Sequence, residues 1–266
     1  NVGLAILFLP FTTIFARFCE WVVPDRPESR KGLPEIIVPK YLDDSLISTP
    51  QLGLARCRLE IARLGESVRE MFDKILPAVL TGGRQDLQEI VDIDDKVDTL
   101  YGEIVVYLGK LSKTNLSDEH AKELFFLFQS VDRLENIGDI MEKSMVRVGT
   151  KRIEDSIVIS KATLNIISKY HSQITSVLKD TVNVIANDNV DAINRVRNLR
   201  EEIASMTLET EKHGIERLTA DAPKRLDTYA RERETIEYMN SIYRICRRIA
   251  ESAPSNGNTT QTSGPN

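Results

Sequence analysis

The chain has 266 residues, of which 41% are hydrophobic and 28% are charged, so it can bury a sizeable core and still cover its surface with charge. Because 40 acidic residues stand against 35 basic ones, the net charge is only −5, and no basic field predicts a nucleic-acid partner. The three cysteines are far apart and form no CxxC pair, which argues against a disulfide framework or a thiolate metal site. The aromatic content is 6%, and Gly and Pro are sparse through the middle of the chain, a balance typical of long helices, so the composition favours an all-α fold.

Residues 1–23 form an apolar segment in which only Arg17 and Glu20 are charged. The uncharged run Asn1–Ala16 is slightly shorter than the roughly 20 residues that span a bilayer. We interpret the segment as the end of a last transmembrane helix that begins upstream, so the helix is truncated in this chain. A buried core helix and a secretory signal peptide are the alternatives, although the basic n-region and small-residue cleavage site of a signal peptide are absent.

Residues 24–48 form a basic, proline-rich linker, in which the prolines prevent a continuous helix. Four basic residues lie within about 20 residues of the apolar segment: Arg26, Arg30, Lys31 and Lys40. Because basic flanks stay on the cytoplasmic side of a membrane, we expect the rest of the chain to lie in the cytoplasm. The alternative is that these charges only solvate the linker.

Capping residues and breaks divide the following sequence into helices. Thr49 is expected to cap a first helix that has Pro50 at its first position and ends at about Leu80, before Gly82-Gly83. The apolar pattern then predicts a second helix, whose core positions alternate at spacings of three and four.

The third helix is expected to begin after a Ser117 cap and to end at Gly149. Three further helices are predicted at roughly 155–187, 189–220 and 223–252, before a tail at 253–266 that is too polar to pack. The lengths indicate a three-helix unit that occurs twice, with a period of about 105 residues. The predicted organisation is therefore a helical domain over 49–252, made of two antiparallel three-helix bundles at 49–150 and 154–252.

Acidic residues interrupt the apolar pattern on two helices of the first bundle. Asp94 occupies a core position of the second helix, and Asp95 and Asp98 form an i, i+3 pair beside it. On the third helix, three carboxylates continue a stripe that begins with phenylalanines: Asp132, Glu135 and Asp139. Like charges at these spacings repel one another by a few tenths of a kcal/mol, so something should offset the repulsion.

A hard divalent cation would offset it through oxygen ligands. Neither helix segment offers His or Cys beside these acids, so the donor set indicates Mg²⁺, Mn²⁺ or iron rather than zinc. The alternative is a solvated acidic face with salt bridges to Lys96 and Arg133. Spacing alone leaves both interpretations open.

Three sequence segments resemble a known family. YLDDSLISTPQLGLA, VDIDDKVDTLY and VDRLENIGDIMEKS are similar to the PhoU domain that follows the last span of bacterial type II sodium/phosphate cotransporters, and NVGLAILFLPF resembles the end of that span. The resemblance implies a PhoU-like fold and an acidic E(D)xxxD motif able to hold a multinuclear metal cluster. By this resemblance the metal ligands are Asp94, Asp98, Glu135 and Asp139, with Asp95 and Asp132 as accessory candidates.

The resemblance also implies a function. We expect the chain to be the C-terminal portion of a sodium-dependent inorganic phosphate cotransporter, or symporter, of the bacterial inner membrane. Its helical domain would lie in the cytoplasm and regulate or stabilise the transport part. Its partners would be the membrane and an N-terminal transmembrane transport domain, which would bind the phosphate and sodium. A homo-oligomer is a further possibility. The alternative is a soluble PhoU-like metal-binding regulator of phosphate uptake or signalling. No nucleophile motif or phosphate loop is present, so we expect no enzyme.

The second bundle departs from the acidic pattern. At a shift of 108 residues, Asp132, Glu135 and Asp139 correspond to Asn240, Tyr243 and Arg247. The fold symmetry is thus expected to persist while the second metal site is lost.

Overall fold

The computed structural model describes residues 38–218 and 224–254, and in these residues it is helical with no β-strand. The helices are η1 (Asp44–Leu46), α2 (Pro50–Leu80), α3 (Arg84–Leu111), α4 (Asp118–Asp139), the π-helical segment η2 (Ile140–Met145), α5 (Val146–Glu154), α6 (Lys161–Asn187), α7 (Val190–Asn198), α8 (Arg200–Leu218) and α9 (Arg225–Ser252). The all-α prediction is confirmed. The expected membrane helix, most of the linker and most of the tail lie outside the described residues. Within the described part, no helix has both the length and the apolar character that a bilayer crossing needs.

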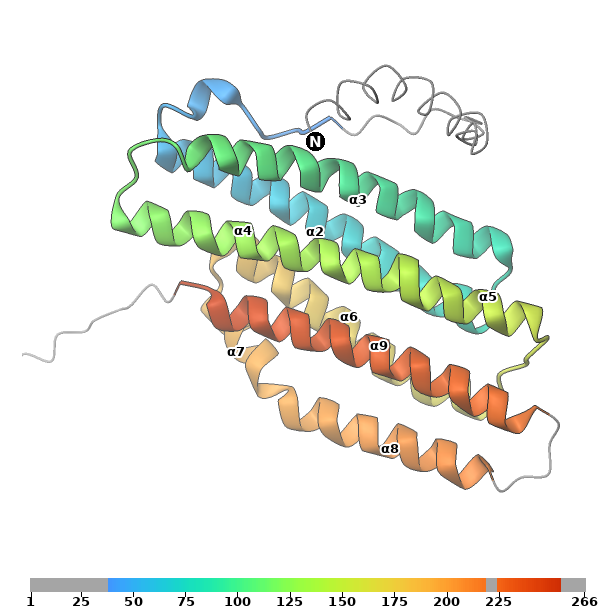
Figure 1. Ribbon diagram of the computed structural model, residues 1–266. Helices are drawn as coiled ribbons and strands as arrows, with labels where there is room; N and C mark the ends of the chain where they lie inside the picture. Colours follow the sequence, from blue (N-terminus) through green and yellow to red (C-terminus); the bar gives the residue numbers. More distant parts are fainter. Residues whose placement is uncertain (1–37, 219–223, 255–266) are drawn as a thin grey trace, which may run out of the picture. The chain divides into compact units, whose positions relative to one another are not determined.

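Two helical bundles lie against each other. Figure 1 shows α2, α3 and the rod formed by α4, η2 and α5 side by side, with α6, α9 and α8 following below them. Helix α2 packs on α6 and α4 packs on α9, so the two bundles share one hydrophobic core of buried residues. The repeated three-helix plan predicted from the sequence is present, except that α7 and α8 together take the place of one helix.

Local capping explains several helix ends. Pro50 stands at the first position of α2, where a missing N–H costs no hydrogen bond, but Thr49 makes no side-chain cap. The Ser117 hydroxyl accepts a hydrogen bond from the His120 N–H at 3.2 Å and begins α4 as predicted. The Asp86 carboxylate accepts from the Gly83 N–H at 2.7 Å, which fixes the start of α3 after the glycine break.

Three predicted boundaries are wrong. The third helix passes Gly149 and ends at Glu154. A Cβ at Gly149 would lie 2.7 Å from the Leu87 side chain. That glycine therefore makes room for close packing and does not cap the helix. The fourth helix begins after a Ser160 cap instead of near residue 155, and the fifth is divided at Leu199.

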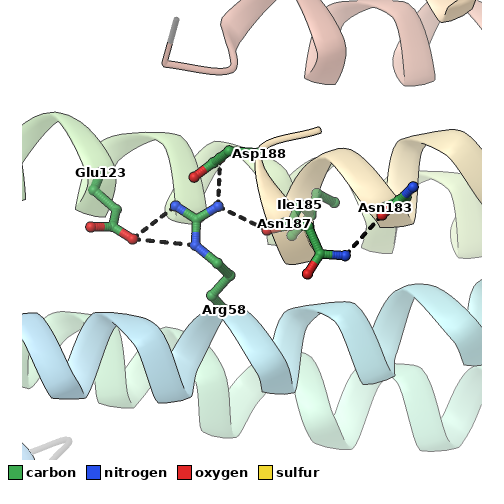
Figure 2. Close-up of polar contacts among 6 residues, drawn as sticks. All are labelled: Arg58, Glu123, Asn183, Ile185, Asn187 and Asp188. Carbon is green, nitrogen blue, oxygen red and sulfur yellow. Dashed lines mark hydrogen bonds and ion pairs between the residues drawn. The ribbon is translucent and has the colours of Figure 1, made fainter. Parts of the chain in front are cut away.

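Arg58 of α2 joins the two bundles at one end of the domain (Figure 2). Its guanidinium donates to the Glu123 carboxylate of α4 at 2.8 Å, and to the Ile185 carbonyl and the Asp188 carboxylate at the end of α6 at 2.9 and 2.6 Å. Arg58 is only 9% exposed and also lies over the Phe126 ring. One buried cation thus connects three helices from both bundles.

Candidate metal centre

Asp94 is a buried acid in the middle of the first bundle. It is 4% exposed, and its Oδ1 atom is buried without a hydrogen-bond partner in the described part of the chain. The α3 stripe places it among core residues, as the sequence predicted. Burial raises the pKa of Asp94 to about 7, and the nearby charges of Asp98, Glu142 and Asp139 add to the shift. A carboxylate held in this way is costly to ionise unless a cation compensates it.

Gly138 of α4 allows Asp94 to lie so deep. A Cβ at position 138 would be 2.6 Å from Asp94 Oδ1, which is closer than the two atoms can approach. A glycine inside a helix costs about 1 kcal/mol relative to alanine. The role of Gly138 is to leave space for the carboxylate of the facing helix.

Two further acids meet Asp94 where α4 changes into the π-helical segment η2. Asp94, Asp139 and Glu142 each offer a carboxylate oxygen, and these oxygens all lie within 4.8 Å of one another. Glu142 is half-buried, and its Oε2 atom also has no hydrogen-bond partner among the described residues. Short π-helical segments inside α-helices occur often at functional sites, and this one begins directly after Asp139.

Glu142 is absent from the ligands predicted from the sequence. The signal was present, because Glu142 continues the spacing of three and four that runs through Asp132, Glu135 and Asp139. The E(D)xxxD motif implied by the family resemblance ends at Asp139, three residues before Glu142. Extending the acidic stripe by three residues beyond Asp139 reaches Glu142.

Asp98 and Glu135 lie beside the three close acids but outside the 4.8 Å group. Partial burial and the charge of Asp139 raise the pKa of both side chains. Of the four ligands predicted first, the structure therefore brings Asp94 and Asp139 together and leaves the other two next to them. We call Asp94, Asp98, Glu135, Asp139 and Glu142 the acidic seam.

The accessory candidates lie at the margin of the acidic seam. Asp95 and Asp132 are both exposed. Burial raises the pKa of the Tyr101 hydroxyl, and the nearby negative charge of Asp132 raises it further. Asp132 therefore lies toward Tyr101. The structure gives neither accessory acid a place in the close group.

Arg133, one of the two basic residues expected to neutralise a solvated acidic face, contacts another helix instead. Arg133 donates to the Arg248 carbonyl at 3.1 Å and to the Ser252 hydroxyl at 2.7 Å, both on α9. None of the described ion pairs joins Lys96 to the seam. Lys143 alone among the described ion pairs contacts it, through Asp139.

The residues present fit a hard divalent cation. Three carboxylates supply oxygen ligands only, and two of their oxygens are buried without a hydrogen-bond partner in the described structure. Oxygen-only ligation is the preference of Mg²⁺ and Mn²⁺ and suits Fe²⁺, and a bound cation would satisfy both orphaned oxygens. The acidic seam is therefore a candidate metal centre.

The corresponding place in the second bundle is neutral. The Tyr170 hydroxyl donates to Asn240 Oδ1 at 2.6 Å, and the Asn240 amide donates to the Thr207 hydroxyl at 3.1 Å. Tyr243 is buried, and Arg247 pairs with Glu251. No second group of three metal-ligating side chains occurs in the described part of this bundle.

Comparisons with known proteins agree with this architecture. Residues 61–145, which include the whole acidic seam, match the sequence model of the PhoU domain. The crystal structure of PhoU from Pseudomonas aeruginosa superposes with a TM-score of 0.67 at 17% identity, over 74% of this chain and 93% of that chain, so the two share a fold.

Longer relatives are similar in sequence. The proteins named "Putative inorganic phosphate export protein YjbB" in Escherichia coli K12 and in Salmonella typhimurium LT2 are each 25% identical over 228 residues, which is 86% of this chain. The chain spans 41% of the length of these relatives. Residues 61–145 thus match the PhoU domain, and the described helices share the all-helical fold of PhoU.

Proposed function

We propose that the chain is a cation-binding regulatory domain of a phosphate transport protein. The observation that carries the proposal is the group of Asp94, Asp139 and Glu142, whose carboxylate oxygens lie within 4.8 Å of one another and which all belong to the residues 61–145 that match the PhoU domain. Asp94 and Glu142 each have one buried oxygen without a hydrogen-bond partner among the described residues. The YjbB relatives are named for inorganic phosphate export, which supports phosphate transport as the process. The role proposed for the described helices is binding and control, not catalysis.

In the full-length protein, sodium-dependent cotransport of inorganic phosphate would be carried by an N-terminal transmembrane part. The apolar residues 1–23 and the greater length of the relatives support this organisation. The protein would then lie in the bacterial inner membrane with the helical domain in the cytoplasm. The domain would regulate or stabilise the transport part.

The acidic seam suggests how such control would work. Asp94 lies on α3, whereas Asp139 and Glu142 lie at the junction of α4 and η2. These residues would hold the ion through carboxylate oxygens, and the ion would supply positive charge that cancels their repulsion. Binding would therefore join α3 to the α4–η2 junction and make the first bundle more rigid.

A second candidate function is a soluble PhoU-like regulator that acts on a separate transporter or signalling protein. The observation that favours it is the match to Pseudomonas aeruginosa PhoU, of which this chain covers 93%. The described helices thus correspond to nearly a whole PhoU chain. Both candidates share the metal centre and differ in whether transport belongs to the same polypeptide.

Phosphate flux tests the proposal. Vesicles that contain the full-length protein should take up or release labelled phosphate, and a sodium gradient should change the rate. An Asp139→Asn, Glu142→Gln double variant should abolish the response of that flux to added Mn²⁺ or Mg²⁺, because two of the three converging carboxylate ligands are gone. An Asp92→Asn variant on the exposed side of α3 is the matched control.

The outcomes separate the two candidates. Flux that responds to cations in the control but not in the double variant supports a regulatory domain fused to a transporter. No flux from the full-length protein alone would reject that organisation and leave the soluble regulator. Flux with the same cation response in both variants would contradict a role for the acidic seam.

A further inference from the structure

Lys143 lies at the edge of the acidic seam and already supplies a positive charge there. Its ammonium group forms an ion pair with Asp139 Oδ1, four residues earlier in the chain. Asp139 also belongs to the group of three acids whose carboxylate oxygens lie within 4.8 Å of one another. One of its two oxygens is therefore already paired with the Lys143 ammonium group in the described structure. An acid followed by lysine at i+4 is the favourable orientation of such a pair on a helix.

The Lys143 charge acts on the whole seam and not only on Asp139. Burial raises the pKa of the other four acids, and the Lys143 charge opposes that shift in each of them: Asp94, Asp98, Glu135 and Glu142. Lys143 thus compensates part of the negative charge that the fold has gathered. It does not reach the orphaned Asp94 Oδ1, which remains without a hydrogen-bond partner in the described residues.

The position of Lys143 makes its charge easy to remove. Its side chain is 63% exposed, whereas that of Asp139 is 32% exposed. An exposed ion pair contributes little free energy, because water replaces it well. The ammonium can therefore leave Asp139 and point into solvent with only rotations of its own side chain.

We infer that Lys143 is an intrinsic counter-ion of the acidic seam. Its ammonium group occupies the cation-binding position at Asp139 and is displaced when a divalent cation enters the seam. This inference rests on the proposed metal centre. Lys143 lowers the affinity for the divalent cation, because the entering ion must first break the ion pair between Lys143 and Asp139. It also protects the cation-free bundle from the repulsion of five acids. The chain thereby sets the cation concentration at which the seam fills.

The test compares Mn²⁺ affinity in the full chain and in three variants by isothermal titration calorimetry. Lys143→Gln removes the charge and keeps the length, so its Kd for Mn²⁺ should fall about threefold to fivefold, the size expected when the ion no longer has to break an exposed ion pair. Lys143→Arg keeps the charge and should bind within about twofold of the unaltered chain, by the same reasoning. Lys122→Gln is the matched control, an exposed lysine on α4 about 30 Å away along the helix rod.

A second measurement follows Lys143 itself in the unaltered chain. Brief treatment with an amine-acylating reagent, read by peptide mass spectrometry, should label Lys143 several times faster with saturating Mn²⁺ than with EDTA, while Lys122 labelling stays constant. An unchanged Mn²⁺ affinity in Lys143→Gln, or equal labelling of Lys143 with Mn²⁺ and with EDTA, would overturn the inference. If Mn²⁺ still binds in these experiments, the proposed metal centre itself is not contradicted. Absence of Mn²⁺ binding in every variant would reject the metal centre and the inference together.

Discussion

Replacing Asp94 by Asn should stabilise the cation-free domain at pH 8 by up to about 4 kcal/mol, since a pKa raised from 3.8 to about 7 corresponds to about 1.4 kcal/mol per unit. Well below pH 4, Asp94 is protonated in both the folded and unfolded states, so the two proteins should be equally stable. As the pH rises from about 4 through 7, the unaltered protein loses stability, because Asp94 ionises freely in the unfolded chain while burial keeps it protonated in the folded state. Asn never ionises and escapes this loss.

Urea unfolding in EDTA at several pH values between 4 and 8 measures the effect. The matched control is Asp92→Asn, which changes an exposed acid of the same helix and should leave stability within about 0.5 kcal/mol at every pH. An Asp94→Asn variant that is less stable than the unaltered chain at pH 8 would contradict the assigned role. A stabilising substitution that also removes cation binding is the pattern expected of a residue kept for function.

Replacing Arg58 by Met should destabilise the domain by about 2–4 kcal/mol, because it leaves several polar groups without their donor. Glu123 and Asp188 would lose an ion pair, and the Ile185 carbonyl would lose a hydrogen bond. The two acids keep about a quarter of their side-chain surface exposed, at 26% and 25%, so water compensates part of the loss. Met preserves the apolar stem that packs near Phe126.

The midpoint of urea unfolding measures this loss as well. Arg69→Met on the same helix is the control, since Arg69 forms only exposed pairs with Glu66 and Asp73 and should cost less than about 1 kcal/mol. Similar losses in the two variants would show that Arg58 does not join the bundles energetically. A loss in Arg58→Met alone supports a single cooperative domain built from both.

Local signals in the sequence predicted most of the fold. The Ser117 cap, the Gly82-Gly83 break and the apolar spacing along α3 depend on residues close together in the chain, and each was recovered. Gly149 was misread because a glycine that ends a helix and a glycine that admits Leu87 are the same letter. Only the tertiary packing distinguishes them.

The candidate site was predictable in part for the same reason. Asp94 could be recognised because an acid at a core position breaks a local pattern, and Asp139 because it lies on an acidic stripe. The contact between Asp94 and Gly138 joins two helices and has no local signature. The convergence with Glu142 likewise depends on how α3 meets the α4–η2 junction, which spacing along one helix does not specify.

The central claim is that the acidic seam binds a divalent cation through Asp94, and titration of the full chain with Mn²⁺ at pH 7.5 tests it most directly. We expect saturable binding in the unaltered chain and in Asp92→Asn, and binding at least about tenfold weaker in Asp94→Asn, since losing one charge-assisted ligand costs about 1.5–3 kcal/mol. Equal Mn²⁺ affinity in the unaltered chain and in Asp94→Asn, or no binding to either, would contradict it.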